Sequence, residues 1–139
     1  MKSVDRISDK LAWKMLAELK FEDITEISPK AQVAHAGLST REFSSGACVR
    51  VRTHISRMGN SDMRKLLFMP ALSCTRYDNY FSKFYFHLLE QGKPKKVAVV
   101  AVMRKMLLTA MGVLKNQQPF DPNWSKKVQE NYQSRLTAV

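Results

Sequence analysis

The sequence predicts a mainly α-helical fold, a single compact domain with an irregular basic segment near residues 43–60. A length of 139 residues suits one domain. Apolar residues make up 45% of the chain, which is enough to build a core. They recur at helical spacing over most of the chain, but at a period of two between residues 49 and 55.

Two helices are expected before residue 38. Ser8 is a candidate N-cap for a helix that runs to about residue 20. The apolar stripe of this helix comprises Leu11, Ala12, Met15, Leu16 and Leu19. After a connector at 21–27, Ser28 and Pro29 predict the N-cap and first position of a short helix, and Gly37 predicts its end.

Residues 38–60 lack a helical period. The members of one alternating set are Val49, Val51, Thr53 and Ile55, and those of the other are Arg50, Arg52 and His54. A period of two places the two sets on opposite faces, which predicts an extended segment with a basic face. Gly59-Asn60 indicates a turn at its end. Such a long stretch without helix is often functional in a compact domain.

Three further helices are expected after this turn. Ser61 is a candidate N-cap for a helix through about residue 77, which Pro70 is expected to kink. An aromatic-rich helix is expected over 79–91, followed by Gly92. Pro94 begins the longest helix, through about residue 114. Its predicted apolar face comprises Val97, Val100, Ala101, Met103, Leu107, Leu108 and Met111. The spacing of Trp124, Val128, Tyr132 and Leu136 predicts a last helix in the tail.

The net charge of +11 is concentrated in the middle of the chain. Residues 1–42 contain seven basic and seven acidic side chains, whereas residues 43–116 contain thirteen basic and three acidic ones. Such a one-sided field favours a polyanion partner, above all nucleic acid. A basic solubilising surface is the plain alternative. No membrane partner is expected, because the basic residues do not follow one amphipathic helix.

The remaining composition argues against several other classes. Cys48 and Cys74 have no zinc-site spacing and suit a reducing cytoplasm. No other set of side chains has metal-ligand spacing, so no metal site or other cofactor is expected in this chain. No apolar run reaches the roughly 20 residues that span a bilayer, and the charged N-terminus does not resemble a secretory signal.

Three blocks, in this order, resemble the C-terminal serine domain of the Piv/MooV-like transposases, the insertion sequence one-ten family. They are AGLSTREFSSG at 36–46, ISRMGNSDMRK at 55–65 and GKPKKVAVVAVMRKML at 92–107. The similarity extends over about residues 8–120. It implies a helical lead-in at 1–27, a serine domain at 28–118 and a helical tail at 119–139. The lead-in resembles a helix-hairpin-helix whose two glycines are missing, with Arg6, Ile7 and Ser8 in that place.

The family's better known members are bridge-RNA-guided recombinases, and the resemblance implies the corresponding partners. DNA is the expected partner, with a guide (bridge) RNA and a homo-oligomer for the full-length enzyme, in the bacterial cytoplasm. In this family a RuvC-like domain with four acidic residues binds the metal. We expect the present chain to lack that domain, so that Mg²⁺ belongs only to the absent part.

Ser45 matches the family's nucleophile, which attacks a DNA phosphate to form a phosphoserine link. A serine hydroxyl needs activation, and the charge that develops on the phosphate needs offsetting. Arg50, Arg52 and Arg57 are near enough in sequence to offset it. Ser44 and Ser56 remain alternative nucleophiles, His54 an alternative general base, and a polar turn at 44–46 the plain interpretation.

Basic residues of several segments are expected to contact phosphates, which positions a nucleic acid without reading its sequence. The candidates are Arg50, Arg52, Arg57, Arg64, Lys93, Lys95, Lys96, Arg104 and Lys105. Gly46, Gly59 and Asn60 are expected to form turns beside the site, where backbone N–H groups can approach a phosphate. A solvated charged face is the alternative, and the aromatic residues at 80–86 are expected to be core rather than a base-stacking platform.

The predicted function is therefore that of a DNA-binding C-terminal domain, or a truncated form, of an insertion-sequence transposase. The full enzyme would use the serine for strand cleavage and exchange, and this chain is not expected to perform transposition alone. A non-catalytic nucleic-acid-binding module and a decayed transposase fragment are the alternatives.

Overall fold

The computed structural model describes residues 7–19, 28–41, 44–45, 49–50, 54–56, 58–77 and 79–123. It confirms a mainly helical fold with short strands in the basic segment. The helices are α1 (Asp9–Leu19), α2 (Pro29–His35), α3 (Ser61–Cys74), α4 (Tyr80–Glu90) and α5 (Lys95–Asn116). The strands are β1 (Thr40–Arg41), β2 (Ser44–Ser45), β3 (Val49–Arg50) and β4 (His54–Ile55).

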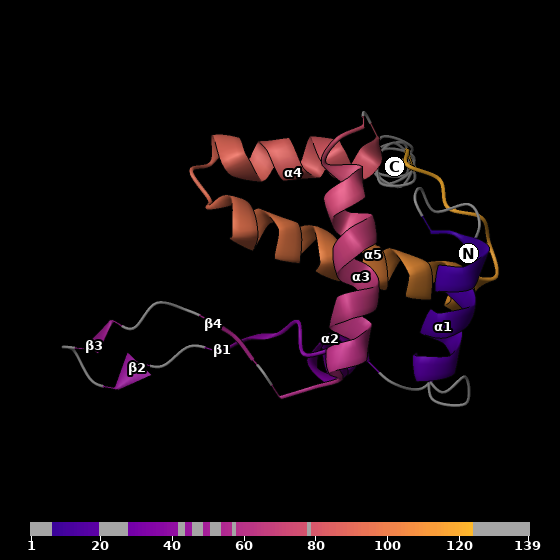
Figure 1. Ribbon diagram of the computed structural model, residues 1–139, viewed down its shortest axis with the longest axis horizontal. Coiled ribbons are helices and arrows are strands. Elements are labelled where there is room, and N and C mark those ends of the chain that lie inside the picture. The colour runs from indigo at the N-terminus through magenta and orange to yellow at the C-terminus, as the bar shows by residue number, and fades with distance from the viewer. Residues whose placement is uncertain are drawn as a thin grey trace, which may run out of the picture.

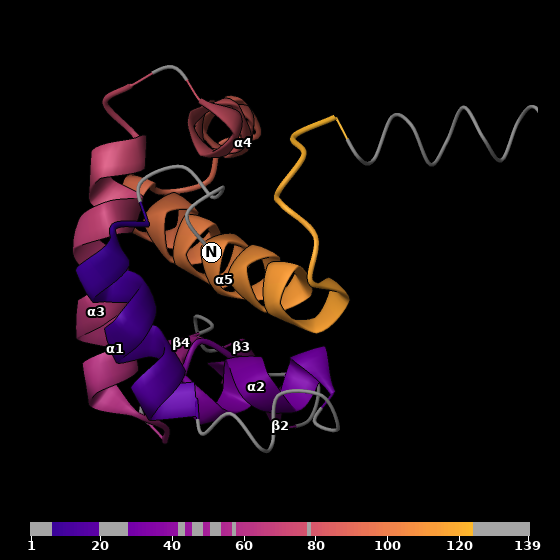
Figure 2. The same cartoon turned by 90° about the vertical axis from the view of Figure 1, so that its right-hand side faces the viewer.

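Helix α5 is the centre of the helical body. Helices α2, α3 and α4 all pack against it, and α1 packs against α3 (Figures 1 and 2). By length and apolar composition α5 meets the requirements for a membrane span. The same composition serves a helix that three others cover, and its buried residues are Ala98, Val99, Val102, Met103, Met106, Leu107, Ala110 and Met111.

One continuous apolar core joins the helices. Its largest fully buried side chains include Phe81 of α4, Met15 of α1 and Leu67 of α3. The expectation that the aromatic-rich helix is largely core holds for Phe81 and Tyr85, which are buried, whereas Phe86 is 51% exposed. Tyr80 and Phe81 also contact Phe120, which follows α5 and lies against the start of α4.

The helix starts follow capping chemistry. The Ser8 hydroxyl accepts a hydrogen bond from the Leu11 N–H at 3.3 Å, and Ser28 caps α2 as predicted. Asn79 and Ser82 form a reciprocal capping box at the start of α4. The predicted cap of α3 is wrong by one residue, because Asn60 rather than Ser61 accepts the hydrogen bonds from the first-turn N–H groups.

Other predicted boundaries and faces need small corrections. Helix α3 ends at Cys74 rather than near residue 77, and Pro70 lies inside it. Pro94 is the N-cap of α5, which continues to Asn116. Val97, predicted on the apolar face of α5, is 53% exposed, because it lies on the side of the helix opposite the buried Val102 and Met106. The tail helix predicted around Trp124 falls outside the described residues.

The four short strands form what we call the β-arm. Strand β1 pairs with β4, and β2 pairs with β3, both antiparallel. Figure 1 shows the β-arm leaving the helical body, with the β2–β3 pair farther out than the β1–β4 pair. The sequence predicted a single extended segment over 49–55. It did not predict that residues 40–45 would supply the partner strands, nor that Ser44 and Ser45 would be strand rather than turn residues.

Candidate nucleic-acid interface

The β-arm begins where α2 ends. The Gly37 N–H donates to the Ala34 carbonyl at 2.9 Å, and the Leu38 N–H donates to the Val33 carbonyl at 3.0 Å. This is a Schellman closure, which needs a left-handed residue after the cap. Gly37 supplies it with φ +65°. The chain then reaches Ser39, whose carbonyl accepts a 2.8 Å hydrogen bond from the Ser56 N–H on the returning strand.

The returning strand crosses the outgoing one at Gly59, and we call this contact of Gly59 with Gly37 the glycine crossing. A methyl group on Gly59 would lie 2.5 Å from the Cα and the backbone nitrogen of Gly37. It would also lie 2.8 Å from the His35 carbonyl oxygen. Gly59 has φ +147°, a conformation that L-residues rarely adopt. Two backbones meet here at a distance that side chains would prevent.

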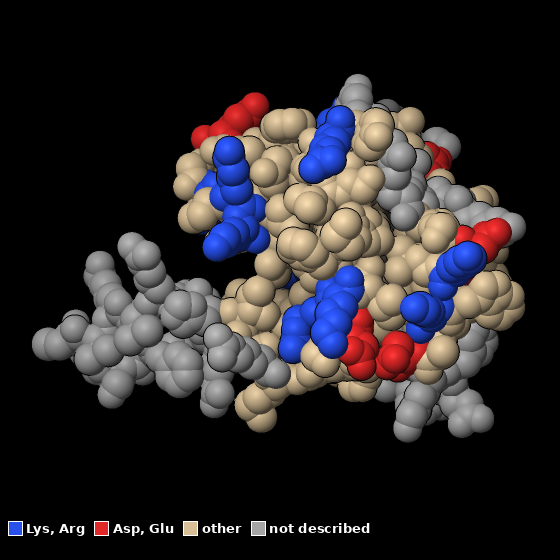
Figure 3. All heavy atoms as spheres, viewed as in Figure 1, with Lys and Arg blue, Asp and Glu red and all other residues tan. Residues whose placement is uncertain are grey.

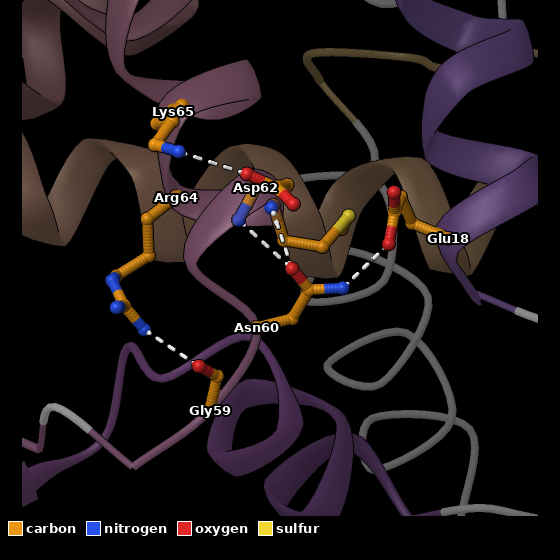
Figure 4. Close-up of polar contacts among 7 residues, drawn as sticks. Glu18, Gly59, Asn60, Asp62, Arg64 and Lys65 are labelled. Atoms are coloured by element: carbon orange, nitrogen blue, oxygen red, sulfur yellow. Dashed lines mark hydrogen bonds and ion pairs between the residues drawn. The ribbon is translucent and has the colours of Figure 1, made fainter.

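Asn60 ties the crossing to three helices (Figure 4). Its N–H donates to the His35 carbonyl at the end of α2, at 2.7 Å. Its Oδ1 accepts from the Asp62 and Met63 N–H groups at 2.8 and 3.3 Å, which caps α3. Its Nδ2 donates to the Glu18 carboxylate on α1. The predicted turn residue is thus also the point where α1, α2 and α3 are joined.

Arg64 lies in the first turn of α3 and points back at the crossing. Its Nη1 donates to the Gly59 carbonyl oxygen at 3.3 Å (Figure 4). A methyl group on Gly37 would overlap Nη1 of Arg64 and lie 3.2 Å from its Cζ. The guanidinium, half-buried, therefore occupies the space that the missing side chain of Gly37 leaves free.

The arm carries the predicted serine in a defined backbone register. Ser45 is paired with Val49, and Ser44 is paired with Arg50. The predictions for Gly46, Arg52 and Arg57 fall outside the described residues.

A second basic group lies on the turn between α4 and α5. The Lys93 N–H donates to the Leu88 carbonyl at 3.0 Å, which closes the end of α4. Lys93, Lys95 and Lys96 are all exposed. Figure 3 shows Lys and Arg atoms over this turn and over the start of α3, with an indentation beneath the first group. In the same view the β-arm extends from the body (Figure 1).

Arg104 and Lys105, predicted as a pair, have different surroundings. Arg104 is exposed. The Lys105 ammonium lies 4.0 Å from the ring centroid of Phe84 and 4.4 Å from that of Tyr80. Such cation–π contacts hold the ammonium against the protein. Lys105 therefore has a structural use in addition to its predicted phosphate contact.

The sequence did not single out two residues at the arm base. Gly37 was predicted only as a helix end, and Glu18 was not considered. The signal for Gly37 was present, since a glycine that ends a helix takes a left-handed conformation. The close approach of Gly59 is a tertiary fact that no local pattern encodes. Among the residues that the structure describes, no group of three or more His, Cys, Asp or Glu side chains is arranged to hold a metal ion.

The chain is similar in sequence to known proteins of one kind. The model described as "Transposase IS116/IS110/IS902 family" matches residues 1–86. The chain is also 36% identical over 96 residues to the pilin gene-inverting proteins of Moraxella lacunata and Moraxella bovis. The aligned region covers 68% of this chain but only 30% of each of those proteins.

Proposed function

The chain belongs to the IS116/IS110/IS902 transposase family, and from this premise we propose that it is a DNA-binding segment of an insertion-sequence transposase. The β-arm and the α4–α5 turn are its DNA-contacting surface. The observation that carries the proposal is the exposed lysine group on the turn, on the side of the body from which the arm extends (Figures 1 and 3).

Electrostatics support this assignment. No ion pair joins Lys93, Lys95 or Lys96 to a carboxylate within the part of the chain that the structure describes, whereas Lys65 pairs with Asp62 at 2.9 Å. Three exposed ammonium groups within four residues attract a row of phosphates and release the counterions bound there. Arg104, which is exposed on α5, and Arg50, in strand β3, are the further residues assigned to phosphate contact in this proposal.

Chemistry is proposed for the serine pair of the arm. Attack of the Ser45 Oγ on a DNA phosphorus forms an O–P bond, while the bond from phosphorus to the sugar oxygen breaks. The serine proton is passed to a base, and the sugar oxygen leaves with a proton. The arginines nearest to Ser45 in sequence, Arg50, Arg52 and Arg57, offset the charge on the phosphate. The metal-binding acidic domain, Mg²⁺, a guide RNA and a homo-oligomer remain predictions for the longer enzyme.

The binding proposal is tested by a matched pair of charge variants. The first replaces Lys93, Lys95 and Lys96 with Ala. The control replaces Lys10, Lys14 and Lys30 with Ala, which removes the same three charges from exposed positions of α1 and α2. Affinity for a fluorescent DNA duplex is measured by anisotropy over a series of salt concentrations.

We expect the turn variant alone to lose affinity and to flatten the log–log salt dependence by up to about 2.7, that is, about 0.9 per lost phosphate contact. Equal losses in both variants would show that net charge, rather than this surface, determines binding. Binding that does not respond to salt would contradict the proposal.

The serine proposal needs a covalent readout. The chain is incubated with labelled DNA and separated under denaturing conditions, alongside Ser45→Ala and Ser44→Ala variants. An adduct that disappears with Ser45→Ala and persists with Ser44→Ala supports Ser45. The reverse pattern assigns the nucleophile to Ser44, the residue paired with Arg50. DNA binding without an adduct in any variant, even when a metal-binding acidic domain of the family and Mg²⁺ are added, favours the non-catalytic binding module for this chain.

A further inference from the structure

The base of the β-arm is held together differently from the paired strands farther out. Along the arm, each strand pair consists of two residues facing two. At the base, the outgoing and returning segments meet at the glycine crossing, next to the ends of two helices. Whatever sets the direction of the arm relative to the helical body must act at this point.

We propose that Arg64, Gly37 and Gly59 form a fixed joint that sets the direction in which the β-arm leaves the helical body. In this joint Arg64 is a positioning residue rather than a phosphate ligand. The arm carries Ser45, so the joint would also set the position of the proposed nucleophile; that consequence rests on the proposed function. The joint itself does not depend on that function.

The contacts at the crossing carry the first step. Gly59 contacts the backbone of Gly37 and the His35 carbonyl so closely that no side chain fits between them. The Asn60 N–H holds the returning segment on the His35 carbonyl at 2.7 Å. These contacts, with the 2.8 Å hydrogen bond from the Ser56 N–H to the Ser39 carbonyl, hold the two segments together. The direction of the pair relative to α3 needs a further restraint from that helix.

Arg64 supplies the second point of restraint. Its guanidinium is a flat, rigid group with N–H donors in a fixed geometry. One nitrogen donates to the Gly59 carbonyl on the returning segment, and the same group fills the space beside Gly37 on the outgoing one. Because Arg64 is anchored in the first turn of α3, it links the orientation of the arm to that helix.

The surroundings of Arg64 differ from those of the lysines assigned to DNA. Its neighbour Lys65 is exposed and pairs with Asp62, whereas the side chain of Arg64 is half-buried and folds toward the crossing. A phosphate at Nη1 of Arg64 would compete with the Gly59 carbonyl, so a phosphate that left this contact intact would have to use the other N–H donors of the guanidinium.

The first experiment measures the arm without DNA. Nitroxide labels are placed by Thr40→Cys on β1 and Glu90→Cys at the end of α4, both exposed positions, in a Cys48→Ser background; Cys74 is buried. Double electron–electron resonance then gives the distribution of distances between arm and body. The labelled chain is compared with Arg64→Ala, with Gly37→Ala and with a Lys65→Ala control.

We expect one narrow distribution for the labelled chain and for Lys65→Ala. Arg64→Ala should at least double its width, and Gly37→Ala should do the same while every charge is retained. A variant that merely lowers stability would reduce the folded fraction without widening the distribution of folded molecules. If Arg64→Ala or Gly37→Ala fails to fold, Arg64→Lys is used, which retains the charge but not the planar fork. An unchanged distribution in the folded variants would overturn the joint.

The second experiment separates positioning from phosphate contact. The salt dependence of DNA binding is measured for Arg64→Ala. We expect the slope to stay unchanged, whereas a phosphate ligand would lose about 0.9 of slope. Loss of slope together with an unchanged distance distribution would make Arg64 a DNA ligand and overturn the proposal. Absence of DNA binding by every form would reject the proposed function but leave the result on the joint valid.

Discussion

The helical body and the base of the β-arm are stabilised in opposite ways. The body is held by many buried side chains, with Phe81, Met106 and Leu107 among those that have no exposed surface. The arm base is held by a few polar contacts and by two glycines whose backbones meet. The difference shows that a change in the body costs free energy according to how much buried volume it removes, whereas a change at the arm base acts through one or two specific contacts.

The helical body and the arm base also differ in how narrowly they restrict the residue at each position. Repeated apolar residues build the body, because any residue of similar size serves at many positions. The arm base needs one residue type at each position: no side chain at Gly37 and Gly59, an amide at Asn60 and a fork of donors at Arg64. Of the surface proposed for DNA, the β-arm depends on these specific positions at its base, whereas the α4–α5 turn belongs to the helical body.

The largest effect is expected from the body. Phe81→Ala removes a fully buried ring that stacks with Phe120 and should lower the free energy of unfolding by about 3–5 kcal/mol. Urea denaturation followed by circular dichroism measures the loss. Phe86→Ala, on the same helix but 51% exposed, is the control and should cost far less. Equal losses would mean that α4 packs on the body by its other face.

The glycine crossing gives the next effect. Gly59→Ala should lower the free energy of unfolding by about 2–3 kcal/mol, because φ +147° and the contact with Gly37 both exclude a side chain. Gly112→Ala is the matched control, since its methyl group would meet nothing within 4 Å and it lies inside α5. That variant should gain about 0.5–1 kcal/mol in the same urea titration. A neutral Gly59→Ala would show that the two segments do not touch.

A smaller loss is expected at the cap of α3. Asn60→Ala removes two hydrogen bonds from first-turn N–H groups and one to Glu18, and should cost about 1–2 kcal/mol. Ser61→Ala should cost little, because Ser61 is not the cap. Thermal unfolding of the two variants side by side tests the assignment. A larger loss of stability for Ser61→Ala than for Asn60→Ala would mean that Ser61 is the N-cap of α3, as the sequence alone predicts.

The smallest effect concerns Lys105. Lys105→Met keeps the aliphatic stem but removes the ammonium from above Phe84 and Tyr80, and should cost about 0.5–1 kcal/mol. Lys83→Met, an exposed position on α4, is the control for removal of one charge. Urea midpoints distinguish the two. Equal midpoints would mean that the contacts of Lys105 with Phe84 and Tyr80 do not stabilise the fold, and would leave phosphate contact as its only proposed role.

The sequence predicted the helical body better than the arm. Apolar spacing located α1 and α5, and the run of aromatic residues located α4. The starts predicted for these three helices lie within one or two positions of the observed ones. Asn60 was missed as a cap because Ser61, equally able to cap, follows it directly. The partners of β3 and β4 were missed because Thr40–Arg41 and Ser44–Ser45 carry no strand pattern of their own. Hydrogen bonding to β3 and β4, rather than local sequence preference, makes these residues strands.

The candidate site shows the same division. The lysines of the α4–α5 turn were evident as a charged run. The joint at Gly37, Gly59 and Arg64 was not, because residues 22 and 27 positions apart in the chain meet only in the folded protein. A positively charged residue near a glycine turn predicts a phosphate contact equally well whether its side chain points outward or, as Arg64 does, back at the turn.

The most direct test of the central claim locates bound DNA on the folded chain by hydrogen–deuterium exchange. With a DNA duplex added, amides of the α4–α5 turn and of the β-arm should exchange more slowly, whereas those of α1 should exchange at an unchanged rate. Protection centred on α1, or uniform protection across the body, would contradict a DNA-contacting surface formed by the turn and the β-arm.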